Sequence, residues 1–88
     1  MESREGRSKL RASKLERTIP LMQSDSWQDR LKAEYRQLNI RIEALEESIK
    51  YHDTSNLLLR DLLTQQLIAM TNYRTALELR ANIFELEL

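Results

Sequence analysis

The chain has 88 residues, too few for a two-domain enzyme, so it forms one small domain at most. Its 14 Lys plus Arg balance 14 Asp plus Glu, and it contains one Gly, one Pro and no Cys. The lack of cysteine excludes disulfides and thiolate metal sites, and the scarcity of Gly and Pro disfavours β-hairpins. Composition therefore predicts an all-α protein of a reducing cytoplasm, with no export signal and no membrane anchor.

Residues 1–23 are a basic segment ahead of an acidic body. They carry a net charge of about +3, and residues 24–88 carry about −3. The segment has a weak apolar pattern, and Pro20 disfavours helix at the residue before it. We expect a basic N-terminal arm, either a mobile tail or one short helix, that breaks at Pro20. Candidate partner-binding residues lie in this arm and just beyond it: Arg7, Arg11, Lys14, Arg17, Trp27 and Arg30.

A first long helix is predicted over residues 25–52. Ser24-Asp25-Ser26 supplies side-chain oxygens for an N-cap, and Gln28 or Asp29 follows three residues after a candidate cap. The apolar residues then recur at alternating spacings of four and three, as in a coiled-coil heptad. This row is predicted to be an oligomerisation seam: Leu31, Tyr35, Leu38, Ile42, Leu45 and Ile49.

The direction in which this helix packs against a neighbour has two interpretations. Isoleucine at a and leucine at d favour a parallel two-stranded coil. The first half of the helix is basic and the second half acidic, the reverse of what the helix macrodipole favours. An antiparallel neighbour compensates for that charge order, so we favour antiparallel packing.

A second long helix is predicted over residues 55–86, after a polar turn at residues 51–56. His52, the single histidine, lies in this turn, where a capping or surface role is expected. Ala69 and Ala76 allow close helix approach. A third, part-polar row contains Leu59, Gln66, Tyr73 and Arg80. The residues predicted to oligomerise on this helix are Leu62, Leu63, Met70, Tyr73, Leu77 and Phe84.

The second helix has apolar residues on several sides, more than one partner helix can cover. The hairpin is therefore expected to self-associate, and two hairpins complete a four-helix bundle. The predicted fold is an antiparallel helical hairpin, or coiled coil, that forms a homo-oligomeric helical bundle. Its predicted parts are the arm at residues 1–23 and a hairpin oligomerisation and binding domain at residues 24–88.

No catalytic or metal constellation is visible in the sequence, so we expect a non-enzymatic protein without a cofactor. Glu43, Glu46 and Glu47 are more simply a solvated surface than a metal cluster. Nucleic acid is expected to bind, if at all, only through the basic arm. Tyr35, Tyr73 and Arg80 either line a ligand pocket between subunits or, for the tyrosines, pack in the core.

Two stretches resemble a known family. They are Trp27-x-x-Arg30-Leu31-x-x-Glu34-Tyr35 and Gln65-Gln66-Leu67-x-x-Met70-x-x-Tyr73, each with the apolar positions around it. Together, over residues 25–84, they resemble small helical-hairpin proteins encoded by tailed bacteriophages, including crAss-like phages. The basic arm has no counterpart in that pattern.

This resemblance implies a phage accessory protein that works in the host cell cytoplasm, and it implies no reaction or ligand. By analogy with small phage proteins, we expect it to bind a host macromolecule and inhibit a bacterial defence component. Two alternatives stay open. One is a scaffold or virion component, and the other is an oligomer that sequesters a nucleotide signal.

Overall fold

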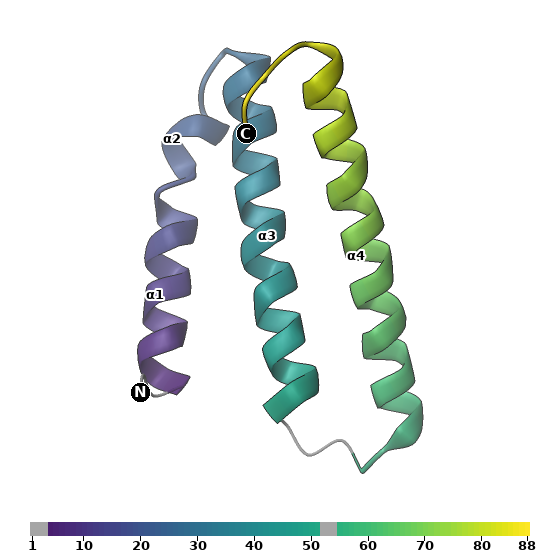
Figure 1. Ribbon diagram of the computed structural model, residues 1–88. Coiled ribbons are helices and arrows are strands. Elements are labelled where there is room, and N and C mark those ends of the chain that lie inside the picture. The colour runs from purple at the N-terminus through teal and green to yellow at the C-terminus, as the bar shows by residue number, and fades with distance from the viewer. Residues whose placement is uncertain (1–3, 52–54) are drawn as a thin grey trace. The chain divides into compact units, whose positions relative to one another are not determined.

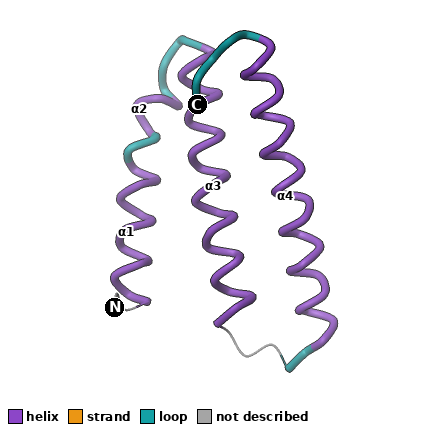
Figure 2. Tube along the Cα trace, viewed as in Figure 1, coloured by secondary structure: helices purple, strands orange, loops and turns teal. Residues whose placement is uncertain are grey.

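The computed structural model describes residues 4–51 and 55–88, and within these ranges every regular element is an α-helix (Figure 2). In chain order they are α1, Arg4–Glu16; α2, Ile19–Met22; α3, Trp27–Tyr51; and α4, Leu57–Ile83 (Figure 1). The predicted all-α class is confirmed. Both long helices begin within two residues of their predicted starts.

The chain divides into two compact units, Met1–Ile40 and Arg41–Leu88, with the boundary inside α3. Within the second unit, the last turns of α3 and the whole of α4 run in opposite directions (Figure 1). This arrangement is the predicted antiparallel hairpin. The prediction for His52 falls outside the described residues.

The start of α3 has the predicted cap. Ser26 Oγ accepts a hydrogen bond from the backbone N–H of Asp29 at 3.4 Å, and Ser24 Oγ donates to the Asp29 carboxylate at 2.8 Å. Asp29 is three residues beyond Ser26, the spacing of a capping residue and its N3 partner. An acidic residue in the first turn also interacts favourably with the positive end of the helix macrodipole.

The N-terminal segment contains two helices, and the break between them precedes Pro20. Thr18 lies between α1 and α2, and its hydroxyl donates to the Leu15 carbonyl at 2.6 Å. Pro20 occupies the first turn of α2, where its missing N–H leaves no helical hydrogen bond unmade. Pro20 therefore starts a helix here, and the predicted break at Pro20 itself is wrong by two residues.

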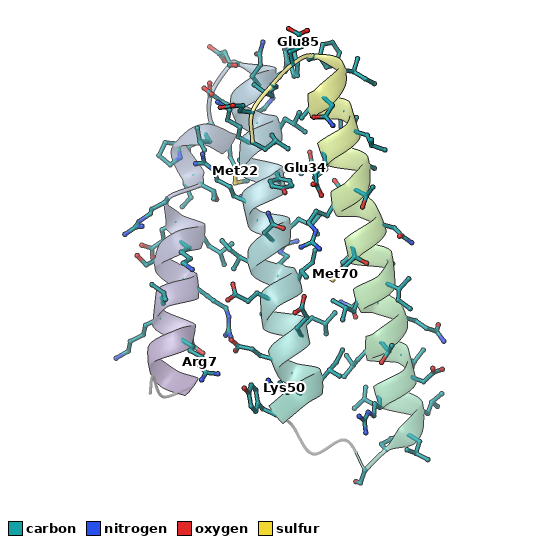
Figure 3. The ribbon with its side chains drawn as sticks, viewed as in Figure 1. Arg7, Met22, Glu34, Lys50, Met70 and Glu85 are labelled. Atoms are coloured by element: carbon teal, nitrogen blue, oxygen red, sulfur yellow. The ribbon has the colours of Figure 1, made fainter. Side chains whose placement is uncertain are left out.

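Helix α3 buries residues on two different sides. The heptad row is buried at Leu31, Leu38 and Ile42 and half-buried at its other members. Ala33 and Ile40 are also buried, and they lie on another side of the helix together with Gln37, at spacings of four and three. Within the first unit, the segment before α3 packs on this second side, because Gln37 Nε2 donates to Thr18 Oγ1 at 2.9 Å and also contacts Sδ of Met22, which Figure 3 labels.

Helix α4 is closed at both ends by local hydrogen bonds. At its start, Asn56 Oδ1 accepts from the backbone N–H of Leu59 at 3.1 Å. At its end, Glu85, labelled in Figure 3, adopts φ 53°. The N–H groups of Glu85 and Leu86 donate to the carbonyls of Asn82 and Ala81. This pairing is a Schellman motif, which ends helices. The predicted end at residue 86 is therefore wrong by three residues.

Candidate binding face on helix α4

Helix α4 has one row of residues that is covered within the chain. The row follows spacings of four and three, and its residues are half-buried or buried. Leu77 and Ala81 are the most covered, at 1% and 2% exposure. We call this the inner row: Leu63, Leu67, Met70, Arg74, Leu77 and Ala81.

A second row lies one residue earlier along the same helix. A shift of one residue rotates the side chain by about 100°, so this row runs beside the inner row along the helix. All of its residues are exposed. We call it the outer row: Leu62, Gln66, Ala69, Tyr73, Ala76, Arg80 and Ile83.

The outer row combines an apolar surface with three polar groups of different kinds. Gln66, Tyr73 and Arg80 lie seven residues apart, so they stand in line at intervals of about 10 Å. Small alanines separate them, at positions 69 and 76. The row therefore presents an amide, a phenol ring and a guanidinium along one exposed line.

The predicted oligomerisation residues of α4 divide between these rows. Leu63, Met70 and Leu77 belong to the inner row, and Leu62 and Tyr73 belong to the outer row. Phe84 is the C-cap residue of α4 and is exposed. Tyr73 is 45% exposed, so it does not pack inside the single chain, whereas Tyr35 on α3 is half-buried.

The residues predicted from the sequence to bind a partner all lie in the first unit. Trp27 is the first residue of α3 and is exposed. Arg30 donates to the Ser24 carbonyl at 2.9 Å, and so supports the loop before α3. Arg7, Arg11 and Lys14 share one face of α1 at spacings of four and three, and Arg17 follows the end of that helix.

The sequence reasoning missed the contact between Thr18 and Gln37. Thr18 is 2% exposed, and its hydroxyl accepts from Gln37 while donating to Leu15. The sequence indicates this second packed side of α3 only through a short row at helical spacing, Ala33, Gln37 and Ile40. The row is hard to recognise because one of its residues is small and another is polar.

Within residues 4–51 and 55–88, no cluster of three or more His, Cys, Asp or Glu side chains could bind a metal ion. None of the helices in this described part is both long and apolar enough to span a membrane. Among the described residues, most of the large hydrophobic side chains that are exposed belong to α4, so its surface is the candidate binding face.

A profile of the Sequestin family matches residues 25–83. The chain belongs to the Sequestin family. The matched range begins in the loop before α3 and ends with the last residue of α4, so it includes both rows of α4 and excludes α1 and α2. Comparisons with curated proteins and with solved structures gave no match.

Proposed function

We propose that this Sequestin-family protein is a non-enzymatic phage accessory protein that sequesters a nucleotide signal of a bacterial defence system. Sequestration means that the protein binds the signal stoichiometrically and withholds it from its receptor. The family name supports this mode of action, and the sequence resemblance to phage hairpin proteins supports the setting, the host cell cytoplasm. Of the functions considered from the sequence, this one makes direct use of the outer row.

The observation that carries the proposal is the exposure of Tyr73 and Arg80 on one line of α4. An aromatic ring stacks on a nucleobase, and a guanidinium binds phosphate through paired hydrogen bonds. A separation of about 10 Å along the helix suits a ligand with a base at one end and a phosphate at the other. Gln66, at the same interval on the other side of Tyr73, adds an amide that can read the edge of a base.

Tight binding of a small ligand needs more enclosure than one helix face provides. Self-association of the protein supplies it, because a second copy on the outer row would cover the ligand from the other side. The proposed site therefore lies between two copies. It needs no nucleophile or general base, since a sequestered signal is released unchanged.

Calorimetric titration of the full chain with cyclic mononucleotides and cyclic dinucleotides tests the proposal. We expect saturable binding by at least one of them. Denaturing the complex should return the nucleotide chemically intact, as judged by chromatography. Recovery of a hydrolysed or otherwise altered nucleotide would show turnover and contradict sequestration.

Substitutions on the outer row test its role in that binding. Tyr73→Ala and Arg80→Ala should each weaken binding at least tenfold, the equivalent of about 1.4 kcal/mol. Arg60→Ala is the matched control, because Arg60 is an exposed arginine of α4 that lies off the outer row. If Arg60→Ala weakens binding as much as Arg80→Ala, the effect is one of general charge and the site is misplaced.

A second candidate function is inhibition of a host macromolecule, and the exposure of Trp27 favours it. An exposed tryptophan beside arginine is a frequent anchor of protein interfaces. In this case the tagged protein should retain one host complex from infected-cell lysate, and Trp27→Ala should release it. Retention of phage proteins alone would instead indicate a scaffold or virion component.

A further inference from the structure

We infer that the outer row of α4 docks on the outer row of a second copy of this chain in antiparallel orientation, with Tyr73 packed over Ala69 of that copy. The inference rests on the self-association in the proposed function. It adds which face of α4 forms the interface, the relative direction of the two α4 helices and the register in which their residues pair. Each follows from the order and exposure of residues on α4 alone.

The first argument is the apolar area that α4 leaves uncovered. Leu62, Tyr73 and Ile83 of the outer row are 52%, 45% and 76% exposed, and Leu59, which lies just before the row, is 47% exposed. Together they expose on the order of 500 Å² of apolar side chain, near the upper end for a typical monomer. The alanines and the aliphatic stems of Gln66 and Arg80 extend the surface toward the roughly 800 Å² that each partner buries in a standard interface.

The second argument is the order of side-chain sizes along the row. Helices approach closely where large side chains of one face small side chains of the other. Turning a second copy end over end about a point near position 71 brings each polar or aromatic residue of the outer row opposite an alanine or an aliphatic residue. The resulting pairs are Leu62 with Arg80, Gln66 with Ala76, and Ala69 with Tyr73, and Ile83 lies opposite Leu59, which precedes the row.

The third argument is charge. Arg80 is the one charged residue of the outer row. A parallel pair in register would set Arg80 against Arg80 and align two helix macrodipoles, and both effects are unfavourable. The antiparallel pair sets Arg80 against Leu62 and at the level of Asp61 of the second copy, where its guanidinium meets an opposite charge at each end of the interface.

The register also completes the proposed ligand site. Gln66 of the second copy falls at the level of Ala76, midway between Tyr73 and Arg80 of the first. Each pair of copies then contains two equivalent sites, each with a ring and a guanidinium from one copy and an amide from the other. A stoichiometry of two nucleotides per pair is expected.

Cysteine cross-linking tests the register directly, because the chain contains no cysteine of its own. The two variants are Gln66→Cys and Ala76→Cys, both at exposed positions. In the antiparallel pair each new cysteine lies about 15 Å along the axis from its own equivalent, too far for a disulfide. A mixture of the two variants places unlike cysteines opposite one another, and up to about half of the chains, the statistical share in mixed pairs, should cross-link.

Three outcomes decide the inference. Cross-links that form only in the mixture support it. Cross-links within either variant alone indicate parallel packing, and no cross-link in any sample shows that the outer row is not an interface, so both overturn it. The matched control is a mixture of Thr64→Cys and Glu78→Cys. In the antiparallel pair these two positions lie at the same height along the helix axes but on the side of α4 opposite the outer row, so this mixture should not cross-link.

Failure of the nucleotide proposal can be separated from failure of this inference. The full chain without cysteine substitutions is titrated with the cyclic nucleotides used above, because Gln66 is part of the proposed ligand site. If the mixed cross-link forms and no nucleotide binds, the register stands and the ligand is wrong. If nucleotides bind and the mixed cross-link does not form, the ligand stands and the register is wrong.

Discussion

Gln37 and Thr18 lie 19 residues apart in the sequence and share a hydrogen bond of 2.9 Å between Gln37 Nε2 and Thr18 Oγ1. The Thr18 hydroxyl also donates to the Leu15 carbonyl, so a single buried oxygen ends α1 and joins the segment before α2 to α3. A buried hydroxyl that both donates and accepts is fully satisfied. Removing it leaves the half-buried Gln37 amide without one of its acceptors.

Thr18→Val therefore tests this contact, since valine keeps the shape and removes the hydroxyl. We expect a loss of about 1–2 kcal/mol in the free energy of unfolding, measured by thermal or urea denaturation. Thr64→Val is the matched control. Thr64 makes the same type of bond to the carbonyl four residues earlier but is exposed, and its loss should cost less than about 0.5 kcal/mol.

The contact also changes what we expect from removal of the basic arm. Weak apolar patterning alone predicts that a chain starting at Ser24 keeps the helicity and subunit number of the full chain. The structure adds that such a chain loses the Thr18 contact and uncovers the side of α3 that carries Gln37. We therefore expect unchanged subunit number by light scattering and a lower melting temperature, by at least about 4 °C. An unchanged melting temperature would show that the arm adds no stability.

Much of this fold could be predicted because its signals are local or periodic. The cap at Ser26 needs only residues three apart, and the α3 heptad row stands out since its apolar residues are large. The second side of α3 could not be predicted, because a glutamine occupies its centre and the residue that satisfies it is 19 positions away. A polar residue is stable on a packed side of a helix only when it has a hydrogen-bond partner there, and the spacing of residues in the sequence does not identify that partner.

The binding face of α4 could also be predicted only in part from the sequence. The heptad spacing of Gln66, Tyr73 and Arg80 is visible in the sequence, as is the broad apolar character of α4. Two rows one residue apart have the same spacing, however, and the sequence does not decide which row the chain covers itself. Burial of Leu77 and exposure of Tyr73 make that distinction.

The end of α4 provides a further prediction. Glu85 adopts φ 53°, a left-handed conformation that costs a residue with a side chain about 1 kcal/mol relative to glycine. Glu85→Gly should therefore raise the free energy of unfolding by up to about 1 kcal/mol, seen as a higher melting temperature. Glu87→Gly removes the same charge just beyond the motif and should produce no gain. Equal gains would assign the effect to charge and not to backbone conformation.

The inner row of α4 should be far more sensitive to truncation than the opposite side of the helix. Leu77 is 1% exposed and Ile68 is 55% exposed, on a side that belongs to neither row. Leu77→Ala should cost about 2–5 kcal/mol, because it removes buried methyl groups and leaves a cavity, and Ile68→Ala should stay within about 0.5 kcal/mol. Circular dichroism melts of both variants provide the comparison. A large loss for Ile68→Ala would mean that a second copy covers that side, in conflict with docking through the outer row.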